Sequence, residues 1–401
     1  MDVVRAGPAV RTRLEVPEDS LFGADNLPYG VFAPRGGEYR VGVRFGAFVI
    51  DLAAVLEDSV FAGPVLNPFL AQGPARWREV RDRVRELVSS DIPTDAVHSL
   101  ADVSLALPIR IGDYVDFYAS IDHATNLGRL FRPDAEPLLP NWRHLPVGYH
   151  GRAGTVVVSG TEVVRPQGQR RTDSGAPDFG PSRRLDIEAE LGFVVGVGSS
   201  LGTPIDIADV ESHLFGVALV NDWSARDIQA WEYQPLGPFL GKSFATSLSA
   251  WVTPLAALDS ARIPLPEQSP PPLPYLTAEQ PWGLDIELTV HWNGHTVAHP
   301  PYARMYWSPA QMLAHLTANG AATRTGDLFA SGTISGPEPG QRGSFIELSW
   351  NGTEPVLLDG DNRTFLEDGD EVVITAAAPG VGVNRIGLGE VRGRILPAHG
   401  K

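Results

Sequence analysis

Residues 185–196, LDIEAELGFVVG, contain the pattern on which the fold prediction rests. Side chains alternate between the two faces of a β-strand. One face would carry apolar residues, namely Leu185, Ile187, Ala189 and Leu191. The other would carry carboxylates, namely Asp186, Glu188 and Glu190. Two interpretations are open at this point. The acidic face is solvated, or it holds a cation, because like charges this close destabilise each other without one.

Most of the chain around this strand is also predicted to be β-structure. Asn-Gly separates β-rich runs in LTVHWNGHTVAH (288–299) and in FIELSWNGTEPVLL (345–358), and this dipeptide is a strong hairpin signal. The 42 Gly and 35 Pro residues favour short strands and turns. Because strands do not alternate regularly with helices, a doubly wound fold is disfavoured. The predicted class is mainly β, of the α+β type.

Two helices interrupt the predicted strands. Apolar residues recur at helical spacing over residues 75–88. A second helix is expected over 308–319, where Ser308 is a candidate N-cap, Pro309 takes the first helical position and Gln311 completes a capping box.

The 401-residue length predicts more than one domain. Residues 1–13 have no pattern and are expected to form a tail. A break over 91–104 ends a small N-terminal domain, 14–105, and leaves a larger one, 106–401.

Composition narrows the functional classes. The formal charge of −16 disfavours nucleic-acid binding, and an anionic substrate would need local positive groups or a metal. No apolar run reaches the roughly 18 residues of a membrane span, and no signal-peptide pattern opens the chain. The absence of Cys excludes thiolate chemistry and fits an intracellular, cytoplasmic protein.

Candidate functional side chains follow two further strands. Asp116 and Tyr118 would share a face in DYVDFYAS (113–120), and His123 follows closely. An apolar run ending at 220 leads into Asn221 and Asp222 and then into a Gly- and Pro-rich loop. Rigid strands followed by polar loops commonly mount functional groups. The alternatives are structural: a buried histidine, a helix capped by Asp222, and an outward-facing Glu347 in a hairpin strand.

Six unusual segments, taken in order, resemble the fumarylacetoacetase family. They are DFYASIDHATNLGRLFR (116–132), LLPNWRHLPVGYHGRAGTVVVSG (138–160), LDIEAELGF (185–193), VNDWSARDIQAWEYQPLGPFLGKSFAT (220–246), LFASGTISG (328–336) and GSFIELSWNGT (343–353). The resemblance extends from about residue 14 to GRILPA near the C-terminus. It implies a small N-terminal SH3-like β-barrel, a large mixed β-roll and a homodimer.

The resemblance also implies an activity and its residues. The activity is metal-dependent hydrolysis of the carbon–carbon bond of 4-fumarylacetoacetate, an anionic diketo acid, to fumarate and acetoacetate at the end of tyrosine catabolism. Ca2+ or Mg2+, which prefer oxygen ligands, would be held by Asp116, Glu188, Glu190 and Asp222, with a second cation region at Asp222, Lys242 and Thr246. His123 would be the general base, oriented by Glu347. Arg226, Gln229 and Lys242 would surround the oxyanion. Substrate would contact Tyr118, Arg132, Tyr149, Gln229, Tyr233 and Thr333.

The sequence departs from the family pattern at minor positions, and two functions other than the implied hydrolysis stay open. Asp122 directly precedes the implied base, and it would point away from His123 if the stretch were extended. A metal-dependent decarboxylase or acylpyruvate hydrolase would share the carboxylates without needing Glu347 beside His123. A non-catalytic metal-binding protein is the third alternative.

Overall fold

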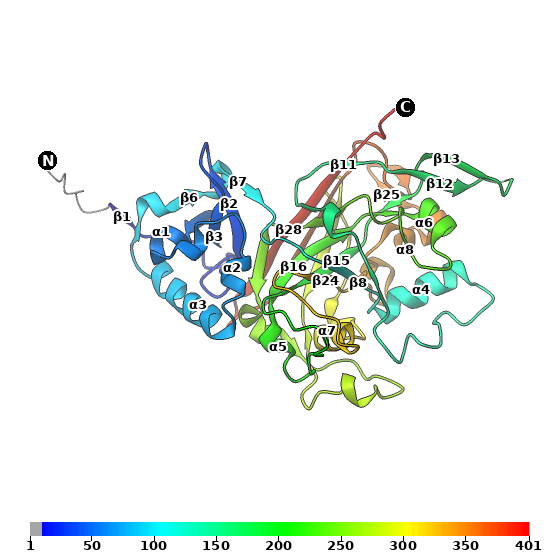
Figure 1. The fold of residues 1–401 in the computed structure, drawn as a ribbon. Coiled ribbons are helices and arrows are strands. Elements are labelled where there is room, and N and C mark those ends of the chain that lie inside the picture. The colour runs from blue at the N-terminus through cyan, green and yellow to red at the C-terminus, as the bar shows by residue number, and fades with distance from the viewer. Residues whose placement is uncertain (1–9, 173, 401) are drawn as a thin grey trace, which may run out of the picture.

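The computed structural model describes residues 10–172 and 174–400. Figure 1 shows a smaller N-terminal part in blue beside a larger C-terminal part in green to red. Residues 1–9 of the expected tail lie outside the described ranges. Arg11–Thr12 form β1, which pairs antiparallel with β5 (Ile92–Pro93).

The N-terminal part is an antiparallel group of strands with helices packed beside it. The strands are β2 (Tyr29–Pro34), β3 (Arg40–Phe45), β4 (Phe48–Asp51), β6 (Val97–Ser99) and β7 (Val103–Ala106). The helices are α1 (Leu52–Leu56), α2 (Asn67–Leu70) and α3 (Pro74–Val88). Helix α3 confirms the helix expected over 75–88, because Val80, Val84 and Val88 face the core.

One sheet runs through both parts of the molecule. Gly30 of β2 lies opposite Trp251 of β19 (Trp251–Pro254), in antiparallel pairing. The sheet continues through β16 (Leu214–Asp222), β15 (Ala189–Val195), β24 (Leu328–Ala330), β8 (Tyr114–Phe117) and β9 (Gly148–His150). Strand β18 (Thr246–Leu248) also pairs with β16, and β10 (Val156–Val158) pairs with β18. Among the described residues its order is open at β6 and β9, so the expected SH3-like barrel is not confirmed.

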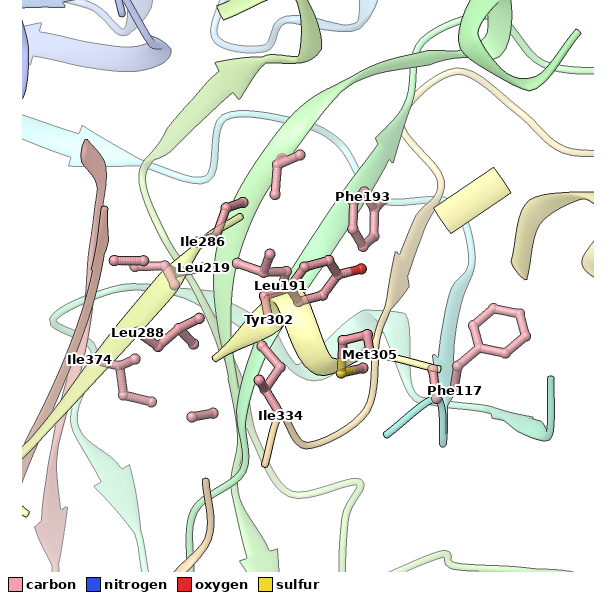
Figure 2. Packing of buried hydrophobic residues seen from close by; sticks show 14 of the residues in the cluster. Phe117, Leu191, Phe193, Leu219, Ile286, Leu288, Tyr302, Met305, Ile334 and Ile374 are labelled. Carbon is pink, nitrogen blue, oxygen red and sulfur yellow. The ribbon is translucent and has the colours of Figure 1, made fainter. Parts of the chain in front are cut away.

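A second sheet covers this one and encloses the core. Its order is β11 (Val163–Val164), β28 (Arg385–Leu396), β27 (Glu371–Pro379), β22 (Glu287–Trp292) and β23 (His295–Ala298). Leu191 of β15 and Leu219 of β16 lie in one buried cluster with Leu288 of β22 and Ile374 of β27 (Figure 2). The mainly β, α+β prediction is therefore confirmed.

The remaining elements are short and surround the sheets. The strand pairs are β12 (Gln167–Arg171) with β13 (Pro177–Pro181), β14 (Leu185–Asp186) with β17 (Ser224–Ala225), β20 (Arg262–Ile263) with β21 (Gly283–Leu284), and β25 (Val356–Leu358) with β26 (Asp361–Arg363). The helices are α4 (Ile121–Phe131), α5 (Val210–His213), α6 (Arg226–Glu232), α7 (Pro309–Thr317) and α8 (Phe345–Leu348). No helix within the described ranges is long and apolar enough to cross a membrane.

Two local sequence signals, the Asn-Gly turn and the helix capping box, predicted their structural elements correctly. Asn293 and Gly294, at φ 50° and 84°, make the turn of the β22–β23 hairpin, as a type I′ turn requires. The Ser308 hydroxyl accepts from the amide of Gln311 at 3.1 Å, and the Gln311 side chain accepts from the Ser308 amide at 3.0 Å. The expected capping box of α7 is thus confirmed.

The prediction of a second Asn-Gly hairpin, over residues 345–358, is wrong. Residues Phe345–Leu348 form helix α8 instead of a strand. The amides of Phe345 and Ile346 donate to Asp186, 159 and 160 residues away in sequence. The Phe345 ring stacks on Trp292 at 4.2 Å between centroids. These long-range contacts outweigh the local turn signal.

Leu191→Ala tests the core between the sheets. The side chain is fully buried, so we expect the substitution to lower the free energy of unfolding by about 2–5 kcal/mol through lost burial and a residual cavity. Urea denaturation measures the change. Leu201→Ala, at a side chain 85% exposed, is the matched control and should change little. Equal effects at the two positions would contradict this account of the core.

Candidate active site

Four carboxylates from adjacent strands converge at one place. Asp116 lies on β8, Glu190 on β15 and Asp222 at the end of β16, while Glu188 precedes β15. The antiparallel register places Ala189 opposite Asn221, and the Asp222 amide donates to the Glu188 carbonyl at 3.1 Å. One oxygen from each of the four carboxylates lies within 4.8 Å of the others. All four are buried, so the solvated-face interpretation is wrong.

The donor set fits a divalent cation. Asp116 Oδ1 and Glu190 Oε1 are buried and have no hydrogen-bond partner among the described residues. Burial first, and then the neighbouring carboxylates, raise the pKa of Asp116 and of Glu190 well above the ordinary range. Buried carboxylates without partners are costly, and a cation would relieve that cost. All-oxygen ligands suit Ca2+ or Mg2+.

Lys242 borders this cluster on the side of the expected second cation region. Its ammonium donates to Asp222 Oδ2 at 2.8 Å and also to Glu188 Oε2. Burial would lower the pKa of Lys242, but Asp222 and Glu188 outweigh it and raise that pKa. The hydroxyl of Thr246 donates to Asp222 Oδ1 at 2.9 Å. Lys242 therefore supplies positive charge beside Asp222 and Glu188.

Tyr149 joins two of the carboxylates at the wall of a cavity. Its hydroxyl lies 3.0 Å from Asp116 Oδ2 and 3.0 Å from Asp222 Oδ2. The cavity has a volume of about 310 Å³, and Lys242 and Thr246 also line it. Small molecules therefore have space beside the carboxylate cluster.

His123 and Glu347 form a buried pair. His123 Nδ1 lies 2.7 Å from Glu347 Oε2, although 224 residues separate the two in sequence. Helix α4 presents the histidine, and the Ser120 side chain caps that helix by accepting from the His123 amide at 3.2 Å. Because Glu347 accepts at Nδ1, the other ring nitrogen is left to act as a base.

Three side chains that sequence reasoning missed hold Glu347 in place. Asn126 donates to Oε1 at 2.9 Å, while Ser335 and Ser344 donate to Oε2 at 3.0 and 2.7 Å. Burial would raise the pKa of Glu347, but His123, Asn126 and Ser344 outweigh it and lower that pKa. The signal for Asn126 was its spacing from His123, which is one helical turn.

The positions of helices α4, α6 and α8 correct three structural alternatives. Asp122 and His123 lie in its first turn, so the stretch is not extended. Asp122 pairs with Arg304 at 3.6 Å. The helix that Asp222 was considered to cap begins only at Arg226, which leaves Asp222 on the strand. Glu347 lies on α8 and not on a hairpin strand.

Arg226 presents a free buried nitrogen beside the cluster. Its Nε donates to Asp186 at 2.8 Å, and its Nη1 donates to Glu188 at 2.7 Å and to Gln229 Oε1 at 3.2 Å. Nη2 is buried without a partner in the described part of the chain. Since Gln229 accepts through Oε1, its amide nitrogen remains a donor.

The expected substrate residues differ in how closely the structure brings them to the site. The Tyr118 ring meets the His123 ring edge to face at 5.3 Å. Burial raises the pKa of Tyr118, and nearby Arg132 opposes that rise. Thr333 Oγ1 is buried with no partner in the described ranges. Tyr233 is 38% exposed on the loop after α6, where its hydroxyl accepts from Gln234.

Known families match both parts of the chain. The C-terminal model of fumarylacetoacetate hydrolase matches residues 114–396, and the N-terminal model of fumarylacetoacetase matches residues 25–108. The chain belongs to the fumarylacetoacetase family. The human fumarylacetoacetase is 47% identical over 413 residues, which cover 96% of this chain and 98% of the relative. The Arabidopsis thaliana fumarylacetoacetase is 43% identical and covers 97% and 99%.

Solved structures share the fold of this fumarylacetoacetase family member at low sequence identity. A fumarylacetoacetate hydrolase from Exiguobacterium antarcticum gives a TM-score of 0.58 at 16% identity, covering 92% of this chain and 99% of that one. A putative HpcE protein from Mycobacterium smegmatis gives 0.55 at 20% identity, covering 92% and 99%. These two structures support the fold alone.

Asp116→Asn tests whether the carboxylates bind a cation. We expect wild-type protein to bind Ca2+ or Mg2+ in calorimetric titrations. The variant should bind on the order of tenfold more weakly or worse, because it loses one anionic ligand. Asp51→Asn removes a buried carboxylate that pairs with Arg40 at 3.0 Å in the N-terminal part, and its affinity should equal that of wild type. Identical affinities in the two variants would remove Asp116 from the site.

Proposed function

We propose that this site hydrolyses the carbon–carbon bond of fumarylacetoacetate and releases fumarate and acetoacetate. The observation that carries the proposal is the His123–Glu347 pair, at 2.7 Å, together with a buried four-carboxylate cluster. The choice of fumarylacetoacetate as the substrate rests on the 47% identity to a fumarylacetoacetase over nearly the whole chain. Ca2+ or Mg2+ would be held by Asp116, Glu188, Glu190 and Asp222.

The chemistry requires a stabilised carbanion and an activated water. The bond to be cleaved joins a carbonyl carbon to a carbon that leaves with the electron pair. When bound, the cation supplies Lewis-acid stabilisation of the enolate that forms. His123 takes a proton from water, whose hydroxide adds to the carbonyl. Collapse of the tetrahedral alkoxide breaks the bond, and the imidazolium returns the proton to the departing carbon.

Glu347 has two functions in this scheme. It accepts the Nδ1 proton of His123, which fixes the tautomer with a free Nε2. It also stabilises the imidazolium after proton transfer. Its other hydrogen bonds, from Asn126, Ser335 and Ser344, keep the carboxylate oriented toward the ring.

Three donors are available for the tetrahedral oxygen. Arg226 Nη2 is buried and unpartnered among the described residues, Gln229 retains its amide nitrogen, and Lys242 uses two of its three donors on carboxylates. Removing one such donor typically costs about 3–4 kcal/mol in transition-state stabilisation. Tyr118, Arg132, Tyr149, Tyr233 and Thr333 would contact the rest of the substrate.

The assembly and the division of the chain are proposed from the family resemblance. Residues 14–105 and 106–401 would be the two domains, and the protein would be a cytoplasmic homodimer.

The His123–Glu347 pair should act as one unit. We expect Glu347→Gln to lower kcat on the order of 10² or more, because the imidazole loses its tautomer control and its counterion. His123→Ala should lower it at least as much. The double variant should be scarcely slower than the slower single variant. Loss of the ultraviolet absorbance of fumarylacetoacetate measures turnover.

Cation affinity provides the control for this pair, since neither residue belongs to the carboxylate cluster and both single variants should bind Ca2+ or Mg2+ as wild type does. Defects that multiply in the double variant would assign the two residues independent functions. Near-normal turnover in Glu347→Gln would favour a decarboxylase-like reaction that needs no activated water.

Arg132→Ala should weaken binding of the anionic substrate more than it slows the chemistry. The chain has a net charge of −16, and Arg132 supplies positive charge near Tyr118. Lost uniform binding raises KM and largely preserves kcat. Arg129→Ala removes a cation from the last turn of α4, directly before Arg132, which caps the C-terminus of that helix; it is the matched control and should keep KM. An unchanged KM in Arg132→Ala would exclude that residue from the substrate site.

A further inference from the structure

Asp186 is a fully buried carboxylate outside the four-carboxylate cluster. Its Oδ1 accepts from the amides of Ile187 and Phe345, each at 2.7 Å. Its Oδ2 accepts from Ile346 N at 3.0 Å and from Arg226 Nε at 2.8 Å. Both oxygens are thus fully used, and no capacity remains for a cation or a substrate.

One end of this network reaches the proposed oxyanion donors. Asp186 lies on β14 and pairs with Ser224 of β17, directly before Arg226. With Nε held by Asp186 and Nη1 by Glu188, the guanidinium plane is fixed at two edges. Because the guanidinium group is planar and rigid, these two contacts also fix the orientation of the N–H bonds of Nη2, which has no partner among the described residues.

The other end reaches the His123–Glu347 pair. Phe345 and Ile346 begin helix α8, which comprises four residues and carries Glu347. A single helical turn is unstable by itself, and its first amides need external acceptors. Asp186 supplies the acceptor for two of them. The placement of helix α8, and with it of the Glu347 side chain, therefore depends on the Asp186 carboxylate.

We propose that Asp186 is a positioning residue that orients Arg226 and helix α8 together, so that the oxyanion donor and the water-activating pair keep a fixed relation. The inference rests on the proposed function, and it adds a group that touches neither substrate nor the reacting atoms. One buried carboxylate would thus set the geometry of both halves of the reaction.

Asp370 provides a matched control for a merely structural ion pair. It is 5% exposed, and it accepts from Arg363 at 2.5 Å, from the Asn293 side chain at 2.8 Å and from the amide of Glu367 at 2.7 Å. It holds the turn before β27 and contacts none of the proposed catalytic groups. Removing its charge tests the cost of breaking one carboxylate–arginine pair away from the active site.

The first experiment compares kcat for wild type, Asp186→Asn and Asp370→Asn. Asparagine keeps the shape of the side chain but presents an amide where two donors now point. We expect Asp186→Asn to lower kcat on the order of tenfold or more beyond the control, with a smaller change in KM, because oxyanion stabilisation acts in the transition state. An inactive wild type would refute the proposed function; an active wild type with equal losses in both variants would refute this inference alone.

The second experiment needs no turnover. The proton between His123 Nδ1 and Glu347 should give a downfield resonance in the proton NMR spectrum. We expect Asp186→Asn to shift or broaden it and Asp370→Asn to leave it unchanged. Should Asp186→Asn fail to fold, Arg226→Lys tests the link from its other end. Lysine keeps the positive charge but cannot hold both Asp186 and Glu188, so the same resonance should move. An unmoved resonance in these variants overturns the proposal.

Discussion

Mutual repulsion among buried carboxylates is the constraint on which this structure depends. Four acidic side chains, three on strands and one directly before β15, each place one oxygen within 4.8 Å of the others. Such an arrangement is unfavourable without positive partners. Lys242 and Arg226 neutralise Glu188, whose pKa burial would raise but which these two cations lower. Asp116 and Glu190 keep oxygens without a hydrogen-bond partner among the described residues, and a divalent cation would satisfy them.

The two-sheet scaffold makes this concentration of charge tolerable. Strands β8, β15 and β16 are anchored by apolar side chains such as Leu191 and Leu219, which pack against the second sheet (Figure 2). A rigid core holds the carboxylates at their strand ends despite their repulsion. Helices α4 and α8 then bring His123 and Glu347 to the same region. Apolar packing between the two sheets thus offsets the unfavourable repulsion among the carboxylates on β8, β15 and β16.

The sequence predicted features whose cause is local. Alternation in residues 185–196 correctly placed Glu190 on a strand, although Ile187 and Glu188 interrupt that stretch between β14 and β15. Asn293-Gly294 located a hairpin, and Ser308 located the start of a helix. Resemblance to a family, and not periodicity, indicated that His123 and Glu347 belong together.

Features with a distant cause were not predictable in this way. Helix α8 forms where a hairpin was expected, because its first amides find an acceptor in Asp186. Ser335 and Ser344 were missed because no local pattern shows which side chains will donate to a distant buried carboxylate. Asn126 had a local signal in its spacing from His123, but its acceptor Glu347 is 221 residues away. The barrel expected for the N-terminal part was not confirmed, because strand β2 pairs with β19 of the larger part and the sheet stays open among the described residues.

That shared strand pairing makes the two parts of the chain mutually dependent. Without β2, strand β19 would present an unsatisfied edge, and exposed edges of this kind invite pairing with other chains. The aromatic contacts of Phe215 with Tyr29, Phe69 and Trp77 would also be lost. The N-terminal part therefore protects the edge of β19 from pairing with other chains. We expect the C-terminal part, expressed without the N-terminal part, to aggregate and not to form a smaller active protein.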